Sequence, residues 1–501
     1  MIEMTQESLL VLSRRGLLKG AAALAGAAVA PAYAQTAPSG PTYVYVGCYT
    51  ARGRGIYQYT LDSATGKLTL VNVTQGEMNP SFIALDPMRR FLYAINEIGN
   101  YEGRQSGSIA AFSIDPANGG LTFLNRQPTE GRTTAHVSVD PTNRYAMVAN
   151  YTGTAQGNVC ILPILGDGSL GPPSHVVDHL GETGPNRGPQ TQSRAHMILP
   201  DASGRFVLAN DLGMDKTLIY ALDRENGKLN PAEQPFAQAA PGAGPRHLAF
   251  HPNGRVVYVI NELNSTMSVF AYDAERGTLQ QRQTQTTLPS FYIGNNSTAH
   301  VVVAPSGKFV YGSNRGHNSI VIFAVNPENG DLTLVGHQLT QGETPRNFAI
   351  DPSGNFLFVG HQNTDSIVTF KVDQVTGRLS PADSFFFGQP QPVCFVFAPP
   401  QPAGNTAKPG VTFWANPDPY PVTDSIPLGQ TTLAWNAPGA SQVEIRIGSP
   451  MGSLMAQLGG YGTARTGRWV PNGLTFFLQD VSGGKALTAE NTLATVRAGV
   501  R

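Results

Sequence analysis

A segment of about fifty residues recurs along this 501-residue chain, and the recurrence constrains the fold more than any other feature. Each copy holds an apolar run, a turn built on Pro-x-Gly-Arg or a variant of it, and a second run rich in aromatic and β-branched residues. Asn and another polar residue usually follow. Such runs, bounded by Gly, Pro, Asn and Asp, are strands and not helices. The copies are Phe82–Asn96, His136–Asn150, His196–Asn210, His247–Asn261, His300–Asn314 and Asn347–His361.

Each copy continues into a third strand, such as Met267–Tyr272, and a weaker fourth, such as Gln280–Gln285. Four short strands per repeat, arranged radially, are typical of a β-propeller. The sequence at Thr42–Cys48 matches a second strand with no first strand before it, whereas Gln391–Phe397 matches a first strand with nothing after it. We therefore predict that the last strand closes the first blade, which gives seven blades and no free edge.

The repeat ends near residue 400, and the composition changes there. We predict an all-β chain: a seven-bladed β-propeller over 42–400, a linker over 401–410 rich in Pro, Gly, Ala and Asn, and a small C-terminal β-sandwich over 411–501. The sandwich would be of immunoglobulin or fibronectin type. It would serve as a spacer, or would bind a cell-wall component or a sugar.

The first 34 residues have the features of an export signal. Ser13-Arg14-Arg15-Gly16 is a twin-arginine segment, an apolar stretch runs from Gly20 to Ala30, and Ala32-Tyr33-Ala34 fits a cleavage site. The apolar stretch is too short to span a membrane. We predict a twin-arginine signal peptide over 1–34, recognition by the twin-arginine export machinery, and a mature protein that is periplasmic or secreted and has no membrane span.

Charge and cysteine content exclude several classes of protein. The chain has 34 basic and 34 acidic residues, with no basic stripe, which argues against a nucleic-acid partner. Three cysteines cannot form a disulfide framework or a four-thiolate zinc site. Cys48 and Cys394 would lie on neighbouring strands of the first blade, either cross-linked or as two buried small side chains.

Alignment of the copies brings polar side chains to one end of the predicted channel, because adjacent antiparallel strands place both sets at the same end. One set begins each first strand: Phe82, His136, His196, His247, His300, Asn347 and Cys394. The other follows each second strand: Tyr49, Glu97, Tyr151, Asp211, Glu262, Arg315 and Gln362. Arg194, Arg246 and Arg346 add positive charge, which suits an anionic, oxygen-rich small molecule. The structural alternative is that these side chains hydrogen-bond neighbouring blades.

Several phrases near this mouth carry a family resemblance. They are Gly244–Gly254 followed by Asn261-Glu262-Leu263, Ser193-Arg194-Ala195-His196, Ser313-Asn314-Arg315-Gly316-His317, and Thr344-Pro345-Arg346-Asn347. Over about 42–400 the chain resembles the lactonase-family propellers of bacterial 6-phosphogluconolactonases. That family also contains fungal enzymes that cyclise carboxymuconate, in which a His, two Arg and a Glu are the proposed active-site residues. The resemblance implies a lactonase acting on a small anionic or polyhydroxylated lactone, with catalytic residues His196, Arg246, Glu262 and Arg315.

In a lactone hydrolase, His196 or Glu262 would activate water, and Arg246 and Arg315 would stabilise developing negative charge. No Gly-x-Ser-x-Gly nucleophile motif is present, and we expect no cofactor and no metal. We expect substrate contacts from His136, Arg194, His247, His300, Arg346 and Asn347. The alternatives are a carboxymuconate-type cyclase, a non-enzymatic exported propeller that binds sugars or cell-surface ligands, and a calcium site formed by Asn96, Glu97, Asn210, Asp211, Asn261 and Glu262.

Overall fold

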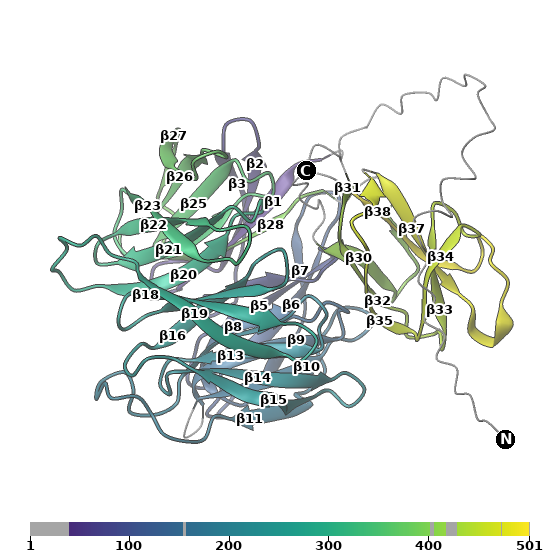
Figure 1. Cartoon of the computed structure of the whole chain (residues 1–501), viewed down its shortest axis with the longest axis horizontal. Helices are drawn as coiled ribbons and strands as arrows, with labels where there is room; N and C mark the ends of the chain where they lie inside the picture. Colours follow the sequence, from purple (N-terminus) through teal and green to yellow (C-terminus); the bar gives the residue numbers. More distant parts are fainter. Residues whose placement is uncertain (1–39, 154–156, 401–404, 417–427, 472, 500–501) are drawn as a thin grey trace, which may run out of the picture. The chain divides into compact units, whose positions relative to one another are not determined.

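The computed structural model describes residues 40–153, 157–400, 405–416, 428–471 and 473–499, and the predicted signal peptide lies outside them. These residues form β-strands and a single 3₁₀ turn, Ser482–Gly484. Seven four-stranded antiparallel sheets are the blades of a propeller, and further strands follow it in the chain (Figure 1). The predicted all-β fold class is therefore confirmed. No helix in the described ranges is long and apolar enough to cross a membrane.

The strands of the blades follow, in the order of blades one to seven. The innermost strands are β28 (Pro392–Ala398), β4 (Ile83–Leu85), β8 (Arg132–Val139), β12 (Ala195–Pro200), β16 (Pro245–Phe250), β20 (Ser297–Val303) and β24 (Pro345–Ile350). The second strands are β1 (Thr42–Cys48), β5 (Phe91–Asn96), β9 (Tyr145–Gly153), β13 (Phe206–Asp211), β17 (Val256–Asn261), β21 (Phe309–Arg315) and β25 (Phe356–His361). The third strands are β2 (Ile56–Asp62), β6 (Ser108–Ile114), β10 (Asn158–Pro163), β14 (Lys216–Asp223), β18 (Thr266–Asp273), β22 (Ser319–Val325) and β26 (Ser366–Val372). The outer strands are β3 (Lys67–Thr74), β7 (Leu121–Pro128), β11 (His175–Asp178), β15 (Lys228–Gln238), β19 (Thr278–Thr286), β23 (Leu332–Leu339) and β27 (Leu379–Phe387).

The first blade is closed by the end of the propeller sequence. Strand β28 pairs with β1, with Gly47 opposite Cys394, as the two half-copies predict. Cys48 and Cys394 are free, buried thiols, as is Cys160. Of the two alternatives for Cys48 and Cys394, the structure shows two buried small side chains.

Tyrosines of the second strands join four of the blades to the next blade. The Tyr45 hydroxyl donates a 2.6 Å hydrogen bond to the carbonyl of Gly119, which lies in the outer hairpin of the next blade. Tyr93, Tyr258 and Tyr311 make the same bond at 2.9–3.0 Å to Gly168, Gly330 and Gly377. These four glycines have φ between 69° and 88°, a conformation that side-chain-bearing residues adopt at a cost. The aromatic residue of the repeat is thus a packing element between blades.

Residues after the propeller form the smaller sheets of the C-terminal sandwich. One sheet contains β29 (Thr406–Ala407), β38 (Thr492–Ala498), β37 (Leu474–Asp480), β33 (Val443–Ile447) and β34 (Ser453–Leu458). The others contain β30 (Thr412–Asn416), β32 (Thr432–Asn436) and β35 (Tyr461–Arg465), and β31 (Leu428–Gly429) with β36 (Val470–Pro471). Trp435, Phe413 and Phe476 fill the core between them. Strand β29 lies within the predicted linker and forms the edge of the first sheet.

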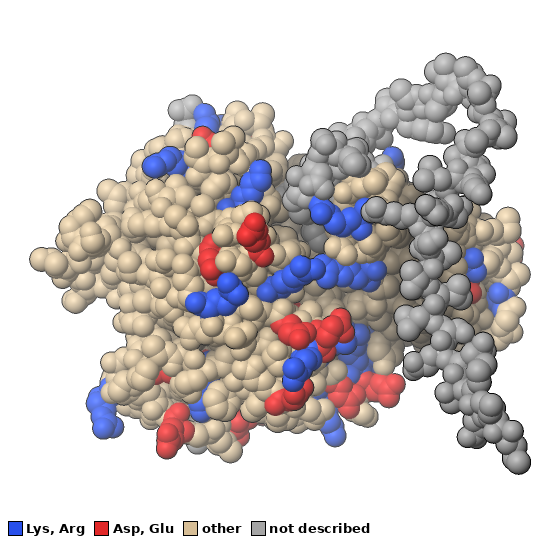
Figure 2. Space-filling view, viewed as in Figure 1, with Lys and Arg blue, Asp and Glu red and all other residues tan. Residues whose placement is uncertain are grey.

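Acidic and basic side chains are interspersed on the face of the molecule shown in Figure 2, and neither sign covers it alone. A nucleic-acid-binding protein needs a continuous basic surface. The visible face therefore agrees with the composition, which argues against such a partner.

Candidate active site

Bulges at the start of three innermost strands direct polar side chains into the mouth of the channel. In β16 the register passes from Pro245 opposite Asn261 to His247 opposite Ile260, so Arg246 is the extra residue. The same shift leaves Arg346 extra in β24 and His196 extra in β12. A bulge turns the side chain of its extra residue away from the regular alternation of the strand. We call this register position, one residue before the channel histidines, the mouth position.

The predicted alignment of His196 with the other channel histidines is wrong by one residue. Counted back from the turn between β12 and β13, Met197 occupies the position that His247 occupies in β16. His196 instead occupies the mouth position, as Arg246 does. Both strands carry the same bulge, so the offset has another origin: the sequence matches His196 to His247 by residue type, whereas the distance to the turn matches Met197 to His247.

Residues at the channel position itself mostly bind the next blade. This position contains Phe82, His136, Met197, His247, His300, Asn347 and Cys394. Four of its side chains accept a hydrogen bond from the backbone N–H of the next innermost strand: His136 from Ile198 (3.5 Å), Met197 from Leu248 (3.1 Å), Asn347 from Phe395 (3.3 Å) and Cys394 from Ile83 (3.5 Å). His136 and Asn347 are predicted to contact substrate. These bonds instead fit the alternative in which both side chains hydrogen-bond the neighbouring blade.

A buried carboxylate between two arginines is the strongest electrostatic feature of the mouth. Glu262 Oε2 lies 2.7 Å from Arg246 Nε, and Glu262 Oε1 lies 3.0 Å from Arg315 Nη2. Arg246 Nη1 also donates to the carbonyl of Ala299 (2.5 Å), and Arg315 Nη2 to that of Thr298 (2.7 Å). Glu262, Arg246 and Arg315 are therefore brought together as predicted.

The charges of this group explain its pKa values. Burial alone would raise the pKa of Glu262, but Arg315 and Arg246 outweigh it and lower that pKa. Burial, with Arg315 close by, lowers the pKa of Arg246 to about 9, against the opposing effect of Glu262. Glu262 is thus ionised and Arg246 protonated at neutral pH, so the group carries one net positive charge.

His196 lies on the same rim and is neutral at neutral pH. Burial, then Arg246 and Arg346, lower its pKa well below the ordinary value of 6.5. The His196 ring is edge-on to the Tyr151 ring, with 5.5 Å between the two ring centroids. The Arg194 guanidinium lies over the Tyr151 ring, 4.9 Å from its centroid. His196 Nδ1 is buried and has no hydrogen-bond partner among the described residues. A neutral imidazole with an unpaired nitrogen is able to accept a proton.

Ser81 and Tyr49 complete the rim. The sequence places Tyr49 in the second polar set without assigning it a role, and it does not single out Ser81. Glu97 Oε2 accepts hydrogen bonds from the Tyr49 hydroxyl (2.8 Å) and from Ser81 Oγ (2.6 Å). The Arg346 guanidinium lies 5.5 Å from the centre of the Tyr49 ring. Ser81 is at the mouth position of its blade, so alignment of that position would have identified it. Neutral Ser81 and Tyr49 have no charge to distinguish them in a sequence.

A small cavity lies where the mouth residues converge. Its volume is about 10 Å³, which is the space of about one water molecule. The lining residues are Ser81, Phe82, Glu97, Ala135, His196, Arg246, His247, Arg346, Asn347 and Val393. Predicted site residues from three blades therefore line this cavity, whereas Glu262 and Arg315 are not among its lining residues.

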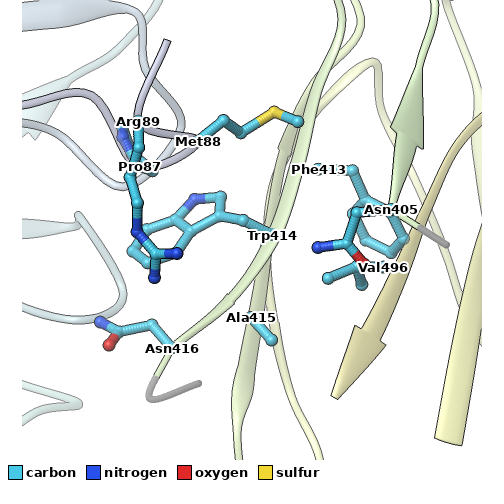
Figure 3. A pocket seen from close by; sticks show the side chains of 9 residues that line it. All are labelled: Pro87, Met88, Arg89, Asn405, Phe413, Trp414, Ala415, Asn416 and Val496. Atoms are coloured by element: carbon cyan, nitrogen blue, oxygen red, sulfur yellow. The ribbon is translucent and has the colours of Figure 1, made fainter. Parts of the chain in front are cut away.

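A second cavity is larger but contains no comparable chemistry. Its volume is about 130 Å³, and it is lined by Pro87, Met88, Arg89, Asn405, Phe413, Trp414, Ala415, Asn416 and Val496 (Figure 3). The lining has no carboxylate and no imidazole. The indole N–H of Trp414 donates to the carbonyl of Pro141. Lactone hydrolysis needs a proton acceptor, so we place the candidate active site at the smaller cavity.

Several members of the alternative calcium site have other partners. Glu97 binds Tyr49 and Ser81, and Glu262 binds two arginines. Asp211 Oδ2 lies 2.7 Å from Nδ1 of His179, a fully buried pair. Over the described ranges, no group of three or more His, Cys, Asp or Glu side chains is arranged to hold a metal ion. The geometry gives this alternative no support.

Comparisons with known proteins agree with the seven-bladed fold. Residues 43–397 match the family model described as lactonase, 7-bladed beta-propeller. The 6-phosphogluconolactonase of Bacillus subtilis is 36% identical over 354 residues, which are 70% of this chain and 97% of that protein. A periplasmic gluconolactonase from Pseudomonas aeruginosa superposes with a TM-score of 0.68 at 30% identity, covering 72% of this chain and 100% of that one. A crystal structure of a 6-phosphogluconolactonase, titled as putative, from Bacteroides fragilis has a TM-score of 0.67 at 31% identity, covering 73% and 99%.

Proposed function

Because this chain belongs to the lactonase family of seven-bladed β-propellers, and is thereby a lactone-hydrolysing enzyme, we propose that it hydrolyses a sugar-acid lactone with the residues of the channel mouth. The observation that carries this proposal is two unpaired nitrogens at the mouth. His196 Nδ1 and Arg315 Nε are buried without a hydrogen-bond partner among the described residues. Buried polar groups are normally paired, so unpaired ones around a mouth favour a ligand that binds them.

In the proposed reaction His196 is the general base. A water molecule attacks the lactone carbonyl carbon while His196 Nδ1 takes its proton. The C–O bond of the ring then breaks, and the protonated imidazole returns the proton to the leaving alkoxide. The product is a hydroxy acid. The cavity beside His196, with its volume of about 10 Å³, is large enough for the attacking water.

Arg246 and Arg315 stabilise the charge that develops on the carbonyl oxygen. Glu262 has both carboxylate oxygens occupied, Oε2 by Arg246 Nε at 2.7 Å and Oε1 by Arg315 Nη2 at 3.0 Å, so neither is free to take a proton from water. Its role in the proposal is to hold both guanidinium groups in place. Glu262 Oε2 occupies Arg246 Nε at 2.7 Å, whereas Arg315 Nε has no hydrogen-bond partner among the described residues and remains able to bind an oxyanion.

The proposed substrate is small, polyhydroxylated and not phosphorylated. Arg246, Arg315 and Arg346 outnumber Glu97 and Glu262 at the mouth, and Arg194 over Tyr151 adds a further positive charge, which favours a lactone whose product is an anionic sugar acid. The relative from Pseudomonas aeruginosa is called a periplasmic gluconolactonase. Its name is consistent with the predicted twin-arginine export of this chain and a periplasmic location. The predicted sugar or cell-wall ligand of the sandwich stays a prediction.

Three substrates tested together would decide between the alternatives. The purified protein is assayed with glucono-δ-lactone, its 6-phosphate and carboxymuconate, after subtraction of spontaneous hydrolysis. We expect the unphosphorylated lactone to be hydrolysed with the highest kcat/KM. Preference for the 6-phosphate would overturn the substrate assignment, and cyclisation of carboxymuconate alone would overturn hydrolysis. Thermal stabilisation by gluconate without any turnover would support the non-enzymatic binding propeller.

A further inference from the structure

His247 and His300 depart from the pattern of the channel position. His136, Met197, Asn347 and Cys394 use their side chains to accept a backbone N–H from the next blade. The His247 ring instead has both nitrogens in other contacts. Its Nε2 lies 3.3 Å from Arg246 Nη1, and its Nδ1 lies 2.7 Å from Nδ1 of His300.

The donors and acceptors in this chain of contacts follow from chemistry. A guanidinium only donates, so His247 Nε2 must be the acceptor and carry no proton. Burial, with Arg246 next in effect, lowers the pKa of His300 to about 3 and that of His247 well below 6.5, so both rings are neutral at neutral pH. Neutral His247 then carries its proton on Nδ1 and donates it to His300 Nδ1. His300 in turn carries its own proton on Nε2.

We infer that His247 and His300 are positioning residues for Arg246. The ordered chain Arg246–His247–His300 fixes one tautomer of each ring, and with Ala299 it fixes the Nη1 end of the Arg246 guanidinium. With that end held, the Nε end faces Glu262 and the mouth. The inference rests on the proposed function in one respect: it gives Arg246 the role of stabilising the oxyanion.

This role differs from the predicted one. The sequence predicts substrate contacts for both histidines. In the structure both ring nitrogens of His247 contact protein groups instead. His247 is buried, at 2% exposure. A ring with both nitrogens occupied has no donor or acceptor left for a lactone hydroxyl, so it acts through Arg246.

The tautomers give a direct test that needs no substrate. Long-range ¹⁵N–¹H correlation spectra of the protein labelled at histidine nitrogens distinguish Nδ1–H from Nε2–H rings. Spectra of the His247→Gln and His300→Asn variants assign the signals. We expect His247 as the Nδ1–H tautomer and His300 as the Nε2–H tautomer at pH 7.5. An Nε2–H tautomer of His247 would overturn the inference, whether or not the protein hydrolyses a lactone.

Variants test the effect on catalysis. His247→Leu removes the acceptor for Arg246, whereas Gln at this position keeps one. We expect His247→Leu to lower kcat about thirtyfold with a smaller change in KM, and His247→Gln to stay within about threefold. His300→Leu should lower kcat in the same direction and His300→Asn should not. The control is His251→Asn, since His251 binds Gly307 and Asn253 in a turn away from the mouth.

The outcomes separate the inference from the proposed function. Equal kcat values for His247→Leu and His247→Gln, in variants that melt at the same temperature, would overturn the inference while lactone hydrolysis stands. Absence of lactone turnover in the unmodified protein would overturn the proposed function. In that case the measured tautomers of His247 and His300 would still show whether the two rings hold the Arg246 guanidinium in place.

Discussion

Nε of Arg246 lies 2.7 Å from Oε2 of Glu262, and these side chains are only 2% and 19% exposed. Removal of one charge from such a pair leaves the other buried and uncompensated. We expect Glu262→Gln to lower the free energy of unfolding by about 3 kcal/mol. Urea denaturation followed by fluorescence measures this change.

The chain offers a matched control for that substitution. Glu233 pairs with Arg276 on the surface, where both side chains are more than half exposed. Glu233→Gln should leave the free energy of unfolding unchanged within error, because exposed pairs contribute little. If Glu262→Gln lowered the free energy of unfolding as little as Glu233→Gln does, the Arg246 charge would not depend on Glu262 for compensation.

The pH dependence of hydrolysis should reflect neutral His196. Its pKa is lowered by burial and by Arg246 and Arg346, and the base must be unprotonated to accept a proton. Activity is therefore fully present above pH 6.5 and falls only at more acidic pH, as His196 is protonated. A pH profile of kcat/KM from 4 to 8 measures this fall. An acid limb centred above 6.5 would contradict the assignment of His196.

Acid stability should improve when His361 is replaced. Four other blades have Asn at this position, and Asn314 Nδ2 there donates to the carbonyl of Thr287 and to Ser319 Oγ. Burial lowers the pKa of His361 to about 4. A lowered folded-state pKa means that stability is complete above pH 6.5, the unfolded value, and is lost as pH falls towards 4.

His361→Asn removes this loss. Relative to the unmodified protein, the variant should gain about 2 kcal/mol in free energy of unfolding between pH 7 and pH 5. Denaturation at the two pH values gives the difference. A constant difference between variant and unmodified protein would show that His361 titrates normally in the folded state.

Chelation should leave the activity unchanged. In the part of the chain that the structure describes, the acidic side chains of the mouth are bound by Tyr49, Ser81 and two arginines, and no metal-binding cluster forms. We expect initial rates of lactone hydrolysis before and after dialysis against EDTA to agree within error. Loss of activity that Ca²⁺ restores would contradict the expectation that no metal is needed.

The fold was predictable because the same pattern of strand runs and turns recurs in each copy of the repeat. Strand runs, turns and the pairing of β28 with β1 all follow from period and residue type, and the register confirms them. Side-chain direction was not predictable at the bulges. A bulge is one extra residue with no composition of its own, so the sequence could not show that His196, Arg246 and Arg346 leave the regular alternation of their strands. The match of Met197 with His247 was accessible from the distance to the turn, but matching by residue type favoured His196.

The candidate site was predictable in part. Alignment and resemblance identified Arg246, Glu262 and Arg315, and the structure brings their charged groups within 3.0 Å. The partners of the channel histidines were not accessible, because a hydrogen bond between blades depends on which ring nitrogen faces which strand. Such contacts join residues more than fifty positions apart and leave no local pattern.

The central claim is that His196 and Arg246 act together on one lactone. Its most direct test is kcat/KM for glucono-δ-lactone in His196→Gln, Arg246→Gln and the double variant, each with its fold checked by circular dichroism. Residues that act as a unit are not additive, so we expect each single variant to lose about a hundredfold and the double variant little more. Single variants that retain the unmodified rate, or losses that multiply in the double variant, would contradict the account.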